Sequence, residues 1–129
     1  VPLPGNKEAF VNFTDIIGKR LEEKDSIVIY PEAHIWPYYT KIRPFKDMSF
    51  RYPAQYHAPV FYFTNVYRKR KLRKTPRMIT YVDGPFIADS LIPIKEQKAY
   101  LRNKVYDAMT ARSKNNNVEI IKYIRLENE

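Results

Sequence analysis

The sequence contains no cysteine, only three glycines and only two histidines. Without cysteine, neither a disulfide framework nor a Cys-based zinc site is possible. The glycines stand at positions 5, 18 and 84, too far apart to form a phosphate-binding P-loop or a dinucleotide-binding fingerprint. No Gly-x-Ser-x-Gly elbow presents a nucleophilic serine. Nucleophilic catalysis and zinc chemistry therefore have no local signature in this chain, and no metal site is predicted.

Acidic residues are also scarce, since 14 Asp and Glu stand against 23 Lys and Arg, a net charge of +9. Such a balance favours an anionic partner: phosphate, an acidic membrane surface or nucleic acid. No run of about 18 apolar residues is present, so no transmembrane helix is expected, and no secretory h-region occurs near the N-terminus. The chain of 129 residues is long enough for a single domain, residues 1–129, with its own core.

Three segments have the patterns of helices. Asn6 can cap a helix in which Phe10, Phe13, Ile17 and Leu21 recur every three or four residues. Residues 46–56 predict a short helix with Phe50 and Ala54 on one side, broken into pieces by Pro53. Residues 93–114 predict a longer helix, with Pro93 in its first turn and Leu101, Val105 and Met109 four residues apart.

The segment Ser26 to Trp36 is the most informative part of the sequence. Its β-branched run, Ile27–Tyr30, predicts a buried central strand that ends at Pro31, because proline cannot donate to a sheet ladder. Glu32 would then lie at the carboxyl edge of a sheet, where open α/β folds bind ligands. On residue type alone, Glu32 could equally cap the turn that follows.

Further strands are predicted at residues 59–67 and 78–82, because both segments are rich in β-branched and aromatic residues. Residues 118–124 could be an edge strand or more helix, and strand is favoured. The order helix, strand, helix, strand, strand, helix predicts an α/β fold, with a mixed sheet and flanking helices.

The sequence resembles the glycerolipid acyltransferases, of the lysophosphatidic acid (1-acylglycerol-3-phosphate) acyltransferase type. Tyr30-Pro31-Glu32 is similar to the family's Phe-Pro-Glu-Gly-Thr-Arg motif, and Val1-Pro2-Leu3-Pro4 resembles the segment after its second motif. Residues 41–46 resemble the basic tract that follows the Pro-Glu motif. Residues 58–62 resemble the family's fourth motif, a strand of the Val-Pro-Ile-Val-Pro-Val type. The resemblance covers roughly residues 1–90 and implies part of a glycerolphosphate-acyltransferase-like fold.

The resemblance implies a substrate-binding site for the phosphate of a lysophospholipid. The motif's Gly-Thr-Arg is replaced here by Ala33-His34-Ile35, so the family's phosphate-binding arginine is missing at that place. Lys41, Arg43 or Lys46 could substitute for it, and Arg43 is favoured because a guanidinium can bind phosphate through two donors. These cations could also form a solvated loop. Pro31 and Glu32 would shape the acceptor pocket, and Pro59 would position the strand beside it.

The family's catalytic His-x-x-x-x-Asp motif is absent from this sequence. The residue five positions after His34 is Tyr39, and the residue five positions after His57 is Tyr62, so neither histidine can be the general base of that motif. In the family the motif precedes the segment like Val1–Pro4. The resemblance therefore implies the C-terminal part of an acyltransferase, inactive alone, with acyl-CoA or acyl carrier protein as co-substrate and no cofactor.

Several residues could contact a membrane. Arg68, Lys69, Arg70 and Lys71 open a dense basic run between two predicted strands, which could be a solvated hairpin loop or could bind anionic lipid head groups. Trp36 could pack in the core or lie in a wet, apolar belt near lipid. The resemblance implies a cytoplasmic protein on the inner face of the cell membrane. A basic nucleic-acid-binding module is the main alternative, although the run lacks interleaved aromatic residues for base stacking; a non-catalytic interaction domain is another.

Overall fold

The computed structural model describes residue 5 and residues 7–125 of the chain. In this part the elements are α1 (Lys7–Glu22), the 3₁₀ helix η1 (Met48–Phe50), α2 (Arg51–Gln55), β1 (Val60–Arg68), β2 (Arg77–Phe86) and α3 (Ile94–Ser113). The chain is therefore α/β, as the sequence predicted. Residues 1–4 and the expected cap Asn6 lie outside the described residues.

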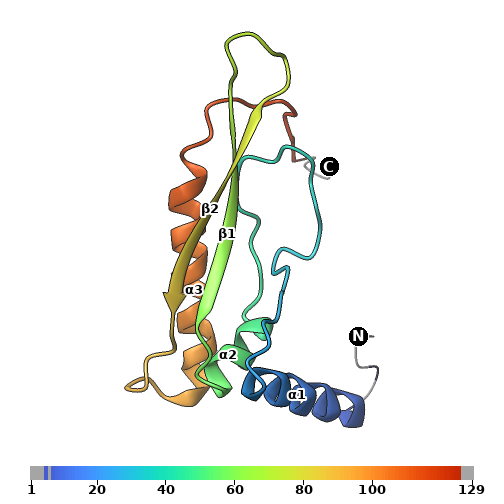
Figure 1. Cartoon of the computed structure of the whole chain (residues 1–129), viewed down its shortest axis with the longest axis vertical. Helices are drawn as coiled ribbons and strands as arrows, with labels where there is room; N and C mark the ends of the chain where they lie inside the picture. Colours follow the sequence, from blue (N-terminus) through green and yellow to red (C-terminus); the bar gives the residue numbers. More distant parts are fainter. Residues whose placement is uncertain (1–4, 6, 126–129) are drawn as a thin grey trace.

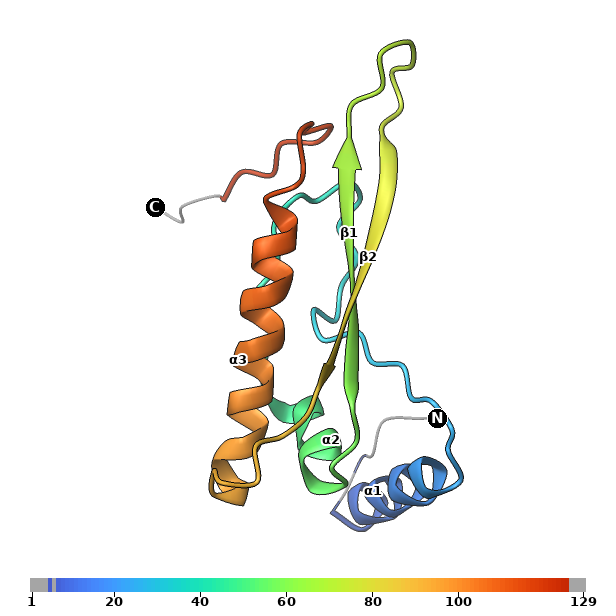
Figure 2. The same ribbon diagram turned by 60° about the vertical axis from the view of Figure 1, so that its left-hand side comes forward.

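A long antiparallel hairpin, formed by β1 and β2, is the centre of the fold. The helix α3 runs along one face of the hairpin, while α1 and α2 lie near the end of it that is opposite the turn (Figure 1). Alternate residues of β1 face α3, so that Tyr62, Thr64 and Val66 are buried. Figure 2 shows the turn between the strands projecting past the end of α3.

The core forms where α3 meets the hairpin and α2. Leu101, Val105 and Met109 are all buried, so the predicted apolar face of this helix is confirmed. They pack with buried residues from the other elements and connections: Phe45, Phe50, Ala54, Tyr62 and Ala88. Pro93 occupies the N-cap of α3 and not its first turn, and its carbonyl accepts the N–H groups of Glu96 and Gln97.

The helix α1 packs against α2 through a glycine. A Cβ atom on Gly18 would lie 2.6 Å from the Cζ atom of Tyr56, so only glycine allows the ring to come this close. The Tyr56 hydroxyl donates a 3.1 Å hydrogen bond to the carbonyl of Thr14, one turn earlier in the helix. Gly18 therefore has a packing role, which explains its place inside an otherwise regular helical pattern.

A second glycine shapes the irregular end of the hairpin. Gly84 has φ of 130°, and a Cβ atom there would lie 2.7 Å from the carbonyl oxygen of Val60. The register slips at this point, between the pairs Val60 with Phe86 and Tyr62 with Asp83. Such a bulge increases the local twist and lets the chain turn from β2 towards α3.

The prediction of a central strand at Ile27–Tyr30 is wrong. These residues are an irregular extended segment, and the two described strands pair only with each other. Val28 and Tyr30 are 74% and 79% exposed, so the apolar run is not buried by the described residues. A β-branched run forms a strand only where a neighbouring strand is available for pairing, and the described residues offer none to this segment.

The expected strand at residues 118–124 is also absent. One backbone bond, from the N–H of Asn117 to the carbonyl of Tyr67, continues towards β1, after which the chain leaves the hairpin. In the described part of the chain the sheet is antiparallel, with two strands, and not the mixed sheet that was expected.

Candidate functional site

Glu32 closes a loop of the chain onto itself. Its carboxylate Oε2 accepts a 2.8 Å hydrogen bond from the backbone N–H of Arg43. Both residues are half-buried. This bond holds the two ends of the segment Glu32–Arg43 together, so we call that segment the acceptor loop. The Glu32 carboxylate is therefore hydrogen-bonded to the backbone of Arg43 and is only partly exposed to water.

The turn that carries Glu32 has an unusual backbone. The N–H of His34 donates to the carbonyl of Glu32 at 2.8 Å, and the residue between them, Ala33, has φ of 62°. This bond across a single residue is that of a γ-turn with positive φ, a rare conformation for any residue but glycine. Strained backbone of this kind is found preferentially at functional sites.

The side chain of Arg43 lies over the indole ring of Trp36. The guanidinium carbon is 4.3 Å from the ring centroid, which is a cation–π contact. Its Nη1 atom is buried and has no hydrogen-bond partner among the described residues. The ring face therefore holds the guanidinium in place, and its Nη1 donor is enclosed without a protein acceptor, so an anion could reach this donor only after neighbouring side chains moved.

The C-terminal segment fixes the aromatic side of the acceptor loop. Tyr123 stacks on Trp36 with ring centroids 4.9 Å apart, and its hydroxyl donates to the carbonyl of Pro37 at 2.9 Å. Tyr39 packs edge-on against both rings. Trp36, which was considered for membrane contact, is thus the centre of an aromatic cluster and is 39% exposed.

A single asparagine joins the acceptor loop to the rest of the fold. The Nδ2 atom of Asn116 donates to the carbonyl of Thr40 at 3.0 Å and to that of Ser113 at 2.7 Å. Its Oδ1 atom accepts the N–H of Tyr67 at 2.6 Å. One carboxamide therefore connects the loop, the end of α3 and the hairpin. No sequence motif indicates this role, because the three partners of Asn116 lie in separate segments of the chain.

The other predicted site residues are not drawn into the same cluster. Lys41 and Lys46 are exposed, and no ion pair or hydrogen bond joins either side chain to Glu32 or Arg43 within the described chain. Pro59 precedes β1, and Pro31 is half-buried beside Glu32. Thus Glu32, Arg43 and Trp36 come together, and the two lysines and Pro59 remain outside this group.

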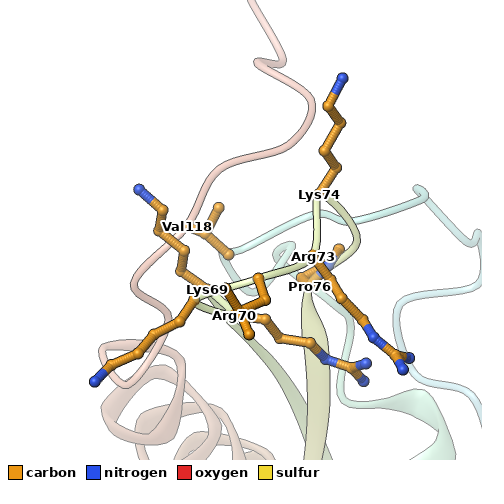
Figure 3. A pocket seen from close by; sticks show the side chains of 8 residues that line it. Lys69, Arg70, Arg73, Lys74, Pro76 and Val118 are labelled. Atoms are coloured by element: carbon orange, nitrogen blue, oxygen red, sulfur yellow. The ribbon is translucent and has the colours of Figure 1, made fainter.

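Basic residues 68–71 lie at the hairpin turn. Lys69, Arg70, Lys71, Arg73 and Lys74 line an open hollow of about 400 Å³, together with Leu72, Pro76 and Val118. Figure 3 shows Arg70 and Arg73 extending to the same side of the turn. A second hollow of about 470 Å³ lies at the start of α3, where His57 is one of the lining residues.

An ionic network that the sequence did not predict lies between β2 and α3. Arg112 donates to both carboxylate oxygens of Asp83, at 2.8 and 2.6 Å, and its guanidinium lies 4.5 Å from the ring centroid of Tyr81. The hydrogen bond from Arg112 holds the pKa of Asp83 below its usual value, while burial and the nearby Asp83 raise the pKa of Tyr62. No spacing rule could have paired residues 29 positions apart.

Within the described part of the chain, no three acidic or histidine side chains gather closely enough to hold a metal ion. None of the helices described there combines the length and the apolar character that crossing a bilayer requires.

Comparison with known proteins gives no relative from which a function could be transferred. No protein-family model matches the chain, no curated protein is similar to it, and no solved structure matches it.

Proposed function

We propose that the chain is the C-terminal part of a glycerolipid acyltransferase of the lysophosphatidic acid acyltransferase type. The parent reaction is the attack of a lysophospholipid hydroxyl on the carbonyl of an acyl thioester, acyl-CoA or acyl carrier protein. The new ester forms, the thiol leaves, and a general base takes the hydroxyl proton. In this chain the acceptor loop binds the glycerol phosphate.

The observation that carries the proposal is the bond between the Glu32 carboxylate and the Arg43 N–H. The resemblance supplied two separate pieces, a Pro-Glu motif and a basic tract beginning at Lys41. The hydrogen bond connects them across 11 residues and leaves the Arg43 guanidinium beside Trp36, with a buried Nη1 donor that has no partner among the described residues. In this arrangement Glu32 shapes the loop and Arg43 neutralises the phosphate. These are the two roles that the resemblance implies for them.

The backbone of Ala33 gives independent support. The family's motif has glycine immediately after the Pro-Glu pair, and Ala33 stands at that position. Its φ of 62° lies in the region that favours glycine. A glycine could adopt this φ without strain, so the local geometry is compatible with the glycine of the family's motif, even though the side chain differs.

The apolar surface of the chain supports a place in a larger fold. The face of the hairpin that α3 leaves uncovered carries Phe61, Phe63 and Val82, all more than half exposed. The run Ile27–Tyr30 is exposed as well. Apolar surface of this extent is what further parts of an acyltransferase fold would bury. His34 and His57 are both exposed and lack the motif partner, so the general base belongs to those further parts.

Binding of lysophosphatidate below its micellar concentration tests the role of Arg43. We expect Arg43→Gln to weaken binding about tenfold or more, because charge-assisted hydrogen bonds to phosphate are lost, and Arg43→Lys to lie in between. The matched control is Arg51→Gln, because Arg51 also lies over an aromatic ring, that of Phe10, but outside the loop. If the folded Arg43→Gln variant binds lysophosphatidate with unchanged affinity, Arg43 does not bind the phosphate and the proposed site is wrong.

Turnover provides a second test. The chain by itself is expected to transfer no acyl group, because removing a general base alone typically costs about 10²- to 10⁴-fold in rate. Thioester hydrolysis or transfer that depends on lysophosphatidate, measured with this chain alone, would contradict the assignment of the base to another part of the enzyme.

A basic nucleic-acid-binding module is the second candidate function. The observation that favours it is the projecting hairpin, since a two-stranded ribbon with a cationic turn fits the major groove of a duplex. Residues 68–77 contain no aromatic side chain on which a base could stack.

A further inference from the structure

The hairpin turn is an isolated concentration of positive charge. Seven of the ten residues 68–77, which we call the basic turn, are Lys or Arg, and none is acidic. The ion pairs of the described chain lie elsewhere, on Arg20, Lys98 and Arg112. Among the described residues, Arg68 is the one member of the basic turn whose side chain donates to protein, to the carbonyl of Asn115. These cations repel one another, so an anionic partner would stabilise the turn.

The apex of the basic turn is apolar. Leu72 is 96% exposed and lies between Lys71 and Arg73. An exposed leucine surrounded by long cationic side chains suits the boundary of a bilayer, where the apolar group enters the acyl region and the cations reach the head groups. A duplex exposes little apolar surface beyond its thymine methyl groups, whereas a bilayer offers a continuous acyl region for Leu72, and this difference favours lipid over nucleic acid.

The base of the turn is held firmly by the asparagines after α3. The Oδ1 atom of Asn117 accepts the N–H of Lys69 at 2.8 Å, and the Oδ1 atom of Asn116 accepts that of Tyr67. The hairpin turn therefore projects in a direction set by the end of α3 (Figure 2). From this fixed base the basic side chains spread outward, with Arg70 and Arg73 on one side of the turn and Lys74 pointing away from them (Figure 3).

We propose that the basic turn anchors the protein to anionic membranes, with Leu72 inserted at the level of the head groups and the Lys and Arg side chains bound to lipid phosphates. The lipids that the basic turn would bind are anionic phospholipids. Through Asn116 the anchored turn is connected to Thr40 in the acceptor loop. The inference rests on the charge and exposure of the turn and stands whether or not the acceptor loop binds lysophosphatidate.

Vesicle binding by the full chain tests the charge. Each cation near an anionic surface contributes about fivefold in affinity. We expect the double variant Lys71→Gln/Lys74→Gln to bind phosphatidylglycerol vesicles about 25-fold more weakly than the unchanged chain does. Neither the variant nor the unchanged chain should bind phosphatidylcholine vesicles. The matched control Lys19→Gln/Lys95→Gln removes the same charge from exposed positions on α1 and α3 and should lose much less. Equal losses in the two variants would overturn the inference.

A fluorescent probe tests the insertion of Leu72. Because the chain has no cysteine, Leu72→Cys can be labelled at one position with an environment-sensitive dye. Phosphatidylglycerol vesicles should shift its emission to the blue, whereas the same dye on Asp107→Cys, an exposed position in α3, should not respond. If the protein binds the vesicles but the emission of the dye at position 72 does not shift, Leu72 is not inserted.

Competition separates the lipid surface from other anions. Inorganic phosphate and glycerol 3-phosphate at physiological ionic strength should not displace the chain from phosphatidylglycerol vesicles. Displacement by either, or a higher affinity for a duplex oligonucleotide than for the vesicles, would overturn the membrane anchor. Binding to vesicles but not to lysophosphatidate would support the membrane anchor and contradict the proposed phosphate site. Binding to lysophosphatidate but not to vesicles would support the phosphate site and contradict the anchor.

Discussion

The carboxylate of Glu32 accepts the backbone N–H of Arg43 at 2.8 Å, and this bond brings an acidic motif and a basic tract into one loop. Because the acceptor is a charged oxygen, the bond is stronger than one between neutral groups. It also fixes where the Arg43 side chain leaves the backbone, above the ring of Trp36.

Removal of the acceptor should loosen the loop. We expect Glu32→Ala to lower the free energy of unfolding by about 1 to 3 kcal/mol, the cost of leaving a partly buried donor without its charged partner. The Arg43 amide should also exchange its hydrogen faster with solvent. Urea unfolding and hydrogen exchange measure the two effects. Glu119→Ala, at an exposed position, is the control, and an Arg43 amide that stays equally protected would contradict the prediction.

A glycine at position 33 should relieve the turn. Ala33 has φ of 62°, where the Cβ atom is unfavourable by roughly 1 to 2 kcal/mol. Glycine removes that cost but has more freedom in the unfolded chain, which offsets about 0.4 to 1 kcal/mol. Ala33→Gly should therefore raise the free energy of unfolding by up to about 1 kcal/mol. A clear destabilisation in urea unfolding would mean that the methyl group makes a contact of its own.

The reverse change, from glycine to alanine, should lower the free energy of unfolding at position 18. In an ordinary helix, Gly→Ala stabilises by about 1 kcal/mol. At Gly18 the new Cβ would meet the ring of Tyr56 at 2.6 Å, so Gly18→Ala should destabilise by about 1 to 3 kcal/mol. In a Tyr56→Ala background the same substitution should become stabilising. A double-mutant cycle by thermal unfolding tests this, and additive effects would exclude the contact.

The pair of Asp83 and Arg112 predicts a dependence of stability on pH. Arg112 holds the pKa of Asp83 below its ordinary 3.8, so the pair's contribution is fully present above that value. It is lost as the pH falls below 3.8 and through the lower pKa of the folded state. Asp83→Asn should be less stable than the native chain at pH 6, and the difference should shrink below pH 3.8. A difference that is the same at both pH values would contradict the ion pair.

The helices and the hairpin were predictable because their patterns are local. The apolar residues of α1 and α3 follow the helical period, and β1 and β2 are rich in aromatic and β-branched residues. Ile27–Tyr30 has an equally strong local pattern, yet it forms no strand among the described residues. Pairing depends on a neighbouring strand, which the composition of a single segment does not reveal.

The candidate site was predictable only in part, for a similar reason. Glu32 and Arg43 could be named from motif order, although the atom that donates to Glu32 is a backbone N–H, which every residue but proline carries. The contacts of Asn116 and of Asp83 with Arg112 join segments far apart in the chain. Such pairings follow from the packing of α3 on the hairpin, and neither composition nor spacing encodes them directly.

The three-way hydrogen bonding of Asn116 has a consequence for related chains. The same side chain serves Tyr67 in the hairpin and Thr40 in the acceptor loop, so the two segments share one fixed point. An insertion or deletion between positions 32 and 43 would move Thr40 away from that point. Chains that differ in the length of this loop should therefore also differ in the asparagine triplet 115–117, so the two segments are expected to vary together.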